Sequence, residues 1–149
     1  MRVIKDIVVH CTATKEEKFF DAKDIDRWHR ARGFREIGYH YVILLDGTIE
    51  VGRSENEIGA HVKGFNRNSI GITYVGGLDN KGKAKDTRTL EQKKSLIKLL
   101  TDLRKRYPNS KISGHRDFSK DLNGNGVIEK FEYMKECPCF NAIEEYKDL

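Results

Sequence analysis

HYVILLDGTIEVG, residues 40–52, carries the strongest local signal in the chain and decides its fold class. Two runs of β-branched and aromatic residues flank the dipeptide Asp46-Gly47. An Asp-Gly pair between two such runs is typical of a β-hairpin with a two-residue turn. We therefore expect two antiparallel strands that are joined by a turn at Asp46 and Gly47.

Further strand signals lie on both sides of this hairpin. Residues 7–9 are a run of β-branched residues that ends at His10, and residues 69–77 (SIGITYVGG) form another apolar run. A shorter run, KISGH, ends at His115. Short apolar runs bounded by polar or turn residues indicate buried strands. His10 and His115 are thus expected where a strand becomes a loop.

Two helices are expected between these strands. Residues 24–32 have apolar residues at helical spacing before Gly33, which predicts a short amphipathic helix with His29 on its surface. Residues 89–92 (TLEQ) fit a capping box, and a leucine stripe follows it as far as Pro108. Further short helices are expected at residues 132–135 and after Phe140. Strands interleaved with helices predict one α/β domain over residues 1–149, with a central mixed β-sheet flanked by helices.

Composition narrows the class of partner. The chain of 149 residues is 38% hydrophobic and 34% charged, and it has no apolar run near the ~20 residues of a membrane span. A net charge of +5 favours polyanions, which include nucleic acid, membrane surfaces and anionic wall polymers. The basic residues are scattered among 23 acidic ones, and no nucleic-acid-binding motif is present. Neither nucleic acid nor a membrane is therefore expected as a partner.

Three cysteines, Cys11, Cys137 and Cys139, cannot form a closed disulfide framework, which favours metal binding or catalysis. Cys137 follows a predicted helix, as His10 and His115 follow predicted strands. Two imidazoles and one thiolate would leave an open fourth position on a tetrahedral zinc ion. The alternative is that each histidine is an ordinary polar residue and the cysteine a small buried one.

An ordered set of motifs covers nearly the whole chain. The motifs are VVHCTAT (8–14), WH (28–29), GYHYVILLDGTIEVGR (38–53), GAHVKGFNRNSIGI (59–72), VGG (75–77), GHRD (114–117) and KECPCF (135–140). In this set the chain resembles the zinc-dependent N-acetylmuramoyl-L-alanine amidases of the phage-lysozyme and peptidoglycan-recognition-protein family. The resemblance implies the same α/β fold, a Zn²⁺ cofactor and peptidoglycan as substrate.

The resemblance also implies roles for individual residues. The implied zinc ligands are His10, His115 and Cys137, and the implied catalytic side chains are Tyr39 and Lys135. Cys137 is preferred to Cys139 because it keeps the K-x-C-P spacing of the family. Cys11 should face away from His10, towards the core, because neighbouring side chains of a strand alternate. The residues that the resemblance places along the substrate groove are His40, His61, Asn66 and Asn68.

The implied reaction is hydrolysis of the amide bond between N-acetylmuramic acid and L-alanine, as in an endolysin or a wall-remodelling enzyme. The alternative is a non-catalytic peptidoglycan-binding or polymerase-inhibiting protein on the same fold. We expect a monomer that is made in the cytoplasm without a signal peptide and that reaches the cell wall by another route, because the N-terminal apolar run is short.

Residues 118–134 depart from the shorter connection of simpler relatives and are expected to form an insertion. Within it, DLNGNGVIEKFE (121–132) matches the spacing of an EF-hand calcium loop. The expected calcium ligands are Asp121, Asn123, Asn125, Val127 and Glu132. A structural Ca²⁺ would stiffen the segment that precedes Cys137, whereas the alternative is a plain Asn-Gly turn.

Overall fold

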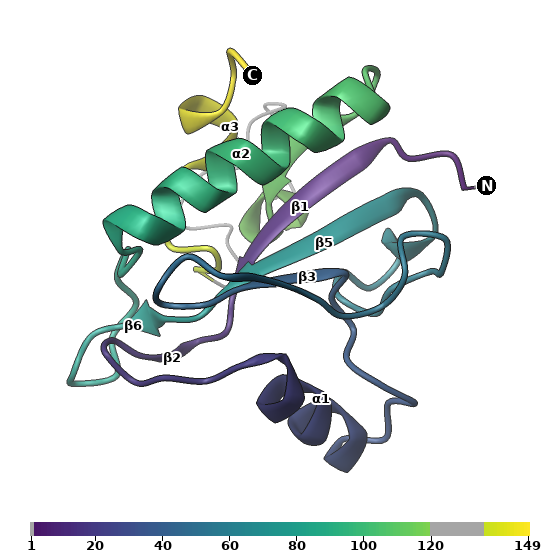
Figure 1. The fold of residues 1–149 in the computed structure, drawn as a ribbon. Coiled ribbons are helices and arrows are strands. Elements are labelled where there is room, and N and C mark those ends of the chain that lie inside the picture. The colour runs from purple at the N-terminus through teal and green to yellow at the C-terminus, as the bar shows by residue number, and fades with distance from the viewer. Residues whose placement is uncertain (1, 120–135) are drawn as a thin grey trace.

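The computed structural model describes residues 2–119 and 136–149. Its main feature is a five-stranded mixed sheet (Figure 1). In sheet order the strands are β4 (Ile49–Val51), β3 (Tyr41–Ile43), β5 (Ser69–Tyr74), β1 (Asp6–Cys11) and β7 (Lys111–Gly114). Among these five strands, only β3 and β4 pair in the antiparallel sense. β2 (Thr14–Lys15) and β6 (Gly77–Leu78) form a small second sheet. The expected fold class is confirmed.

Helices cover both faces of the sheet. α2 (Leu90–Arg106) crosses one face, and α1 (Ala22–Ala31) lies on the opposite side (Figure 1). Under α2 the apolar residues of β1 and β5 pack against Leu96, Leu100 and Leu103. A smaller cluster that contains Ile25 of α1 packs against Val42 and Leu44 on the other face. α3 (Ala142–Glu145) follows the C-terminal loop. The helices cover the two faces of the sheet, so a functional site is expected at the ends or edges of its strands.

Both long helices begin at capping boxes. Asp21 caps α1 together with Asp24, so this helix begins earlier than the sequence pattern predicts. Thr89 caps α2 together with Gln92, as predicted. The buried Gln92 also donates from Nε2 to the backbone carbonyls of Ile43 and Val75, at 3.2 and 3.0 Å. The first turn of α2 is therefore bonded to the ends of β3 and β5.

The hairpin between β3 and β4 is present, but its turn is longer than predicted. The backbone N–H groups of Leu44 and Gly47 donate to Thr48 and Leu44, which encloses three loop residues. Gly47 has a φ of +88°, whereas Asp46 is not left-handed. This is the three-residue loop with a left-handed glycine, and a two-residue turn of the primed type would need a positive φ at Asp46 as well.

A buried arginine fastens the C-terminal segment to the body of the domain. The Arg88 side chain is 1% exposed and forms ion pairs with Asp86 and Glu145, at 2.8 and 2.6 Å. Its guanidinium lies 3.4 Å from the ring centroid of Phe140 and donates to the hydroxyl of Tyr146 at 2.9 Å. Arg88 thus holds both ends of the segment that follows Cys137.

Arg88→Ala should destabilise the protein by about 2–3 kcal/mol, because a desolvated cation–π contact and charged hydrogen bonds are lost together. Urea denaturation would measure the loss. Arg30→Ala is the matched control, because its ion pair with Asp26 is exposed and should contribute under about 1 kcal/mol. Equal effects of the two substitutions would contradict the role of Arg88.

The difference between wild type and Arg88→Ala should also depend on pH. Hydrogen bonding to Arg88 lowers the pKa of Glu145 below its usual value. A carboxyl group with a depressed pKa contributes stability above its unfolded pKa, about 4.3, and loses it as the pH falls through the folded pKa. The difference in the free energy of unfolding should therefore shrink below about pH 4.

Three of the sequence-based expectations concern residues that lie outside the described part of the chain. They are the helix at 132–135, the catalytic role of Lys135, and the calcium ligands Asp121, Asn123, Asn125, Val127 and Glu132. These stay predictions. Within the described ranges, no helix has the length and apolar character needed to cross a bilayer.

Candidate metal centre

The candidate metal centre lies at the carboxyl ends of β1 and β7, which run in parallel. In their register Val9 lies opposite Gly114, so the next residues, His10 and His115, emerge side by side. Their ring centroids are 4.7 Å apart. His10 is buried and His115 is half-buried at the start of the 3-10 helix η2 (His115–Phe118). The two imidazoles meet because parallel strands end at the same edge of the sheet.

Cys137 reaches the same edge from the C-terminal loop. The backbone N–H of Arg116 donates to the Cys137 carbonyl at 2.8 Å, and the hydroxyl of Tyr74 donates to the Pro138 carbonyl at 2.6 Å. Pro138 also packs directly on Gly114, where an added Cβ would approach its Cδ to 2.5 Å. Because Gly114 has no side chain, the loop can lie against the end of β7. This contact brings the Cys137 thiol beside the histidines.

His10, His115 and Cys137 form the only group of three such metal-binding side chains in the described part of the chain. One ligand atom from each lies within 4.8 Å of the others. A tetrahedral zinc ion with two nitrogen ligands and one sulfur ligand needs separations of about 3.3–3.6 Å, so only a small closure is required. The Cys11 N–H donates to the Cys137 Sγ at 3.1 Å, which fixes the position of the sulfur. The residues therefore fit a zinc ion and leave its fourth position open.

The other two cysteines do not belong to this group. The Sγ of Cys139 lies 3.3 Å from the Gly77 carbonyl and 3.9 Å from the Sγ of Cys11. All three cysteines are free thiols, and Cys11 packs into the core as expected. Contact with Cys137 and burial raise the pKa of Cys11, and contact with Cys11 and burial raise the pKa of Cys139. Both stay protonated at neutral pH, which disfavours them as metal ligands.

Tyr39 lies against the candidate metal centre, just before β3. Its ring centroid is 5.0 Å from that of His10 and 5.5 Å from that of His29. Burial raises the pKa of the Tyr39 phenol well above its usual value. The hydroxyl therefore keeps its proton at neutral pH and can act as a hydrogen-bond donor.

His61, predicted to contact substrate, is bonded to a candidate zinc ligand. Its Nδ1 is 2.9 Å from Nε2 of His10, and its Nε2 is 3.1 Å from the hydroxyl of Ser69. Burial, followed by the nearby cationic groups, lowers the pKa of His61 to about 3. The ring is therefore neutral at pH 7. Ser69 was not singled out from the sequence, because its proximity to His61 arises only when the loop folds back on β5.

Two further histidines, His40 and His29, are buried. His40 is 0% exposed, its Nδ1 accepts from the Gly71 N–H at 3.0 Å, and its Nε2 donates to the Glu57 carbonyl at 2.8 Å. The described contacts of the His40 ring are thus with protein groups, and its role in substrate binding stays a prediction. His29 is 7% exposed and accepts from the Gly38 N–H at 2.9 Å, so its expected place on the helix surface is wrong.

The two predicted groove asparagines differ in their surroundings. Asn66 lines a hollow beside the candidate metal centre, and its Oδ1 accepts from the backbone N–H groups of His61 and Val62, at 2.8 and 2.9 Å. Asn68 instead donates to the Val3 carbonyl at 2.8 Å, near the N-terminus. Asn66 therefore shapes the wall of the hollow, whereas Asn68 is directed away from it.

This hollow has a volume of about 450 Å³ and adjoins the metal centre through His61 and His115. Its other walls include two cations and two aromatic rings, which are Arg32, Lys63, Phe34 and Phe118. None of these four was predicted, because they come from separate segments that only the fold brings together. A wall of this composition suits a ligand that combines apolar surface with negative charge.

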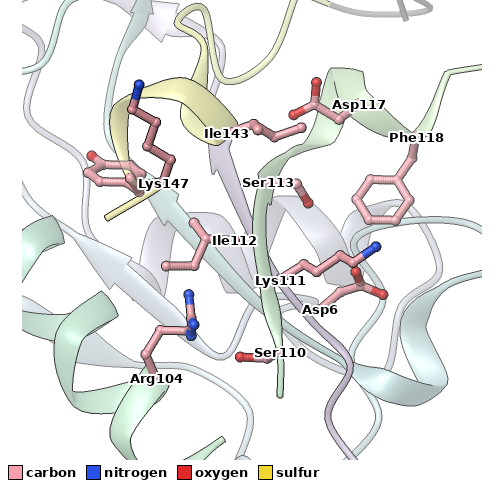
Figure 2. Close-up of a pocket in the computed structure, with 11 residues that line it drawn as sticks. Asp6, Arg104, Ser110, Lys111, Ile112, Ser113, Asp117, Phe118, Ile143 and Lys147 are labelled. Atoms are coloured by element: carbon pink, nitrogen blue, oxygen red, sulfur yellow. The ribbon is translucent and has the colours of Figure 1, made fainter. Parts of the chain in front are cut away.

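A second, larger hollow of about 570 Å³ surrounds the outer edge of β7. Figure 2 shows side chains of both charges around it, among them Asp6, Lys111, Asp117 and Lys147. No member of the candidate metal centre lines this hollow. Size alone therefore does not identify the reaction site, and the chemistry points to the smaller hollow.

Comparison with known proteins agrees with this geometry. A family model described as N-acetylmuramoyl-L-alanine amidase matches residues 1–139. Endolysins of Enterobacteria phage T3 and Escherichia phage T7 are 44% and 42% identical over 111 residues, which cover 74% of this chain and 74% of each relative.

Solved structures show the same likeness. The amidase LysC from Clostridium intestinale superposes with a TM-score of 0.72 at 31% identity, over 97% of this chain and 82% of that one. Drosophila PGRP-LB, at 22% identity and a TM-score of 0.72, shares the fold. Because the family model spans almost the whole sequence and the endolysins exceed 40% identity, the chain belongs to the N-acetylmuramoyl-L-alanine amidase family of enzymes.

Proposed function

We propose that this amidase is zinc-dependent and acts as an endolysin that cuts peptidoglycan between N-acetylmuramic acid and L-alanine. The observation that carries the proposal is the convergence of His10, His115 and Cys137 at the edge of the smaller hollow. These side chains come from three separate parts of the sequence, and their donor types match an open zinc site. A cut at this bond needs such a site next to a groove for the glycan and the peptide.

A zinc ion held by these three residues would polarise the scissile carbonyl and supply hydroxide near neutral pH. The protein contributes the environment of that ion. The N–H of Cys11 donates to the Sγ of Cys137, and Nδ1 of His61 contacts Nε2 of His10. Contacts of this kind orient the ligands of catalytic metal sites.

We assign Tyr39 the role of a hydrogen-bond donor to the reacting carbonyl oxygen. The half-buried phenol keeps its proton, and its ring packs on His10 at the edge of the metal centre. A donor that is aimed at developing negative charge lowers the barrier of acyl transfer. Lys135 keeps its proposed role as a second electrostatic stabiliser, on the basis of its sequence motif alone.

The smaller hollow is the proposed binding site for the muramoyl peptide. The cations Arg32 and Lys63 would attract the carboxylates of the stem peptide. The rings of Phe34 and Phe118 offer apolar surface to the sugar or to the alkyl parts of the peptide. Arg32→Ala and Lys63→Ala should therefore raise KM more than they lower kcat.

A non-catalytic peptidoglycan-binding protein is the second candidate function, because the peptidoglycan-recognition proteins share this fold. The complete set of three donors favours catalysis, since binding alone needs no metal centre. Incubation of the protein with purified peptidoglycan, followed by mass analysis of the soluble products, would decide between them. Release of peptides with a free N-terminal L-alanine would support the proposal, provided that a chelator stops the release and added zinc restores it.

The opposite result is equally clear. Sedimentation of the protein with peptidoglycan, without release of any peptide at added zinc, would indicate a binding protein. Release of peptides that continues in the presence of a strong chelator would contradict the dependence on zinc. We further propose that the enzyme acts as a monomer on the cell wall.

A further inference from the structure

The contact between His10 and His61 belongs to a longer chain of hydrogen bonds. Nε2 of His10 lies 2.9 Å from Nδ1 of His61, and Nε2 of His61 lies 3.1 Å from Oγ of Ser69. Ser69 is fully buried, and its hydroxyl also lies 3.5 Å from the Asn66 carbonyl oxygen. The chain therefore runs from a candidate zinc ligand to a backbone acceptor.

The protons of neutral rings allow this chain of hydrogen bonds to run in two directions. In one, Nε2–H of His10 donates to His61, Nε2–H of His61 donates to Ser69, and the Ser69 hydroxyl donates to the Asn66 carbonyl. In the other, the Ser69 hydroxyl donates to Nε2 of His61, Nδ1–H of His61 donates to Nε2 of His10, and the neutral His10 ring carries its proton on Nδ1. A protonated ring nitrogen cannot bind a metal. Only the first direction uses the Asn66 carbonyl, which is an obligate acceptor.

We propose that His61 is a positioning residue that holds the ring of His10 and directs its Nδ1 to the metal. This inference rests on the proposed zinc dependence and deepens it by naming the residue that selects the ligand tautomer. Both ring nitrogens of His61 have protein partners, so the positioning role uses them fully. His61 also lines the smaller hollow, and its contact with substrate stays a prediction.

Neighbouring residues restrain the position of the His61 ring. An added Cβ on Gly71 would come within 2.6 Å of the ring, and one on Gly59 within 2.9 Å. The Oδ1 of Asn66 holds the backbone N–H of His61 at 2.8 Å. The ring therefore lies directly on the backbone of β5, with little room to turn. Such restraint is what a residue that orients a metal ligand requires.

Zinc affinity is the first test, measured by competition with a chromophoric chelator. His61→Leu should weaken zinc binding by about 10–100-fold, as the loss of such an outer partner usually does. His61→Asn places an amide oxygen near the position of Nδ1, so its affinity should be closer to wild type than to His61→Leu. Arg32→Ala, a change in the same hollow without a bond to a ligand, should bind zinc as wild type does.

Thermal melts of the zinc-free proteins show whether each variant is folded before its affinity is compared. Equal zinc affinity in wild type and in a folded His61→Leu would overturn the positioning role and leave the proposed function intact. No zinc binding by wild type at micromolar metal would overturn both.

The ring nitrogens provide a second test that needs no variant. Long-range ¹H–¹⁵N spectra of the zinc-loaded wild type should show His10 with a protonated Nε2 and a metal-bound Nδ1. The same spectra should show His61 protonated on Nε2. Metal binding through Nε2 of His10 would overturn the proposal, because that nitrogen could not then contact His61.

Discussion

Cys137→Ser is expected to lower both the zinc content and kcat/KM of this amidase by about 10³-fold or more. The substitution replaces the thiolate ligand with a hydroxyl that stays protonated at neutral pH, while His10 and His115 are retained. Metal-assisted hydrolysis draws several kcal/mol from the ion, and each 1.4 kcal/mol is about tenfold in rate. Elemental analysis of protein purified without added metal, together with peptide release from peptidoglycan, measures the two losses.

Cys139→Ser is the matched control for this experiment. Cys139 lies two residues further along the same loop, but its thiol contacts the Gly77 carbonyl and Cys11, not the histidines. Zinc content and turnover should stay close to those of wild type. Loss of zinc in Cys139→Ser with retention in Cys137→Ser would mean that Cys139, not Cys137, is the sulfur ligand. Full occupancy in both variants would refute a cysteine ligand.

Tyr39→Phe should lower kcat by about 10²-fold, as expected for the removal of one hydrogen-bond donor to developing negative charge. The zinc content should not change, because Tyr39 packs on His10 through its ring, which phenylalanine keeps. KM should change little if the hydrogen bond forms only in the transition state. Steady-state kinetics on a soluble muramoyl peptide, with zinc measured on the same sample, separates these quantities.

Tyr41→Phe serves as the control for the loss of a tyrosine hydroxyl. Its side chain packs against the core on the α2 face, and its hydroxyl donates to Glu55. Its kcat should match that of wild type, although the loss of the bond to Glu55 should lower its melting temperature. A Tyr39→Phe enzyme with the wild-type kcat would remove Tyr39 from the mechanism, and a rise in KM alone would make it a binding residue.

The secondary structure follows closely from local patterns. The β-branched run that ends at His10, the Asp-Gly hairpin and the capping box at Thr89 each predicted an element that the structure contains. Such signals are local, because side-chain periodicity and capping depend on residues within a few positions of one another. The turn between β3 and β4 was misjudged because the Asp-Gly pair also suits a three-residue loop with a left-handed glycine.

The burial of His29 and His40 could not be predicted from local patterns. A histidine has no fixed preference for the surface or the interior, so its neighbours decide its burial. His29 faces the backbone of Gly38, and His40 bridges Gly71 and Glu57, which are distant in sequence. Neither partner can be recognised from the periodicity of the segment that carries the histidine.

The sequence by itself determined the fold class, the family and the three side chains that could hold a metal, because motif spacing and residue chemistry are written along the chain. Only the tertiary structure decided that His61 contacts His10, and that Cys11 donates its N–H to Cys137. The parallel register of β1 and β7 and the close contact of Pro138 with Gly114 bring those groups together. Hydrogen bonds of this kind depend on positions in space to within a fraction of an ångström, and packing alone sets those positions.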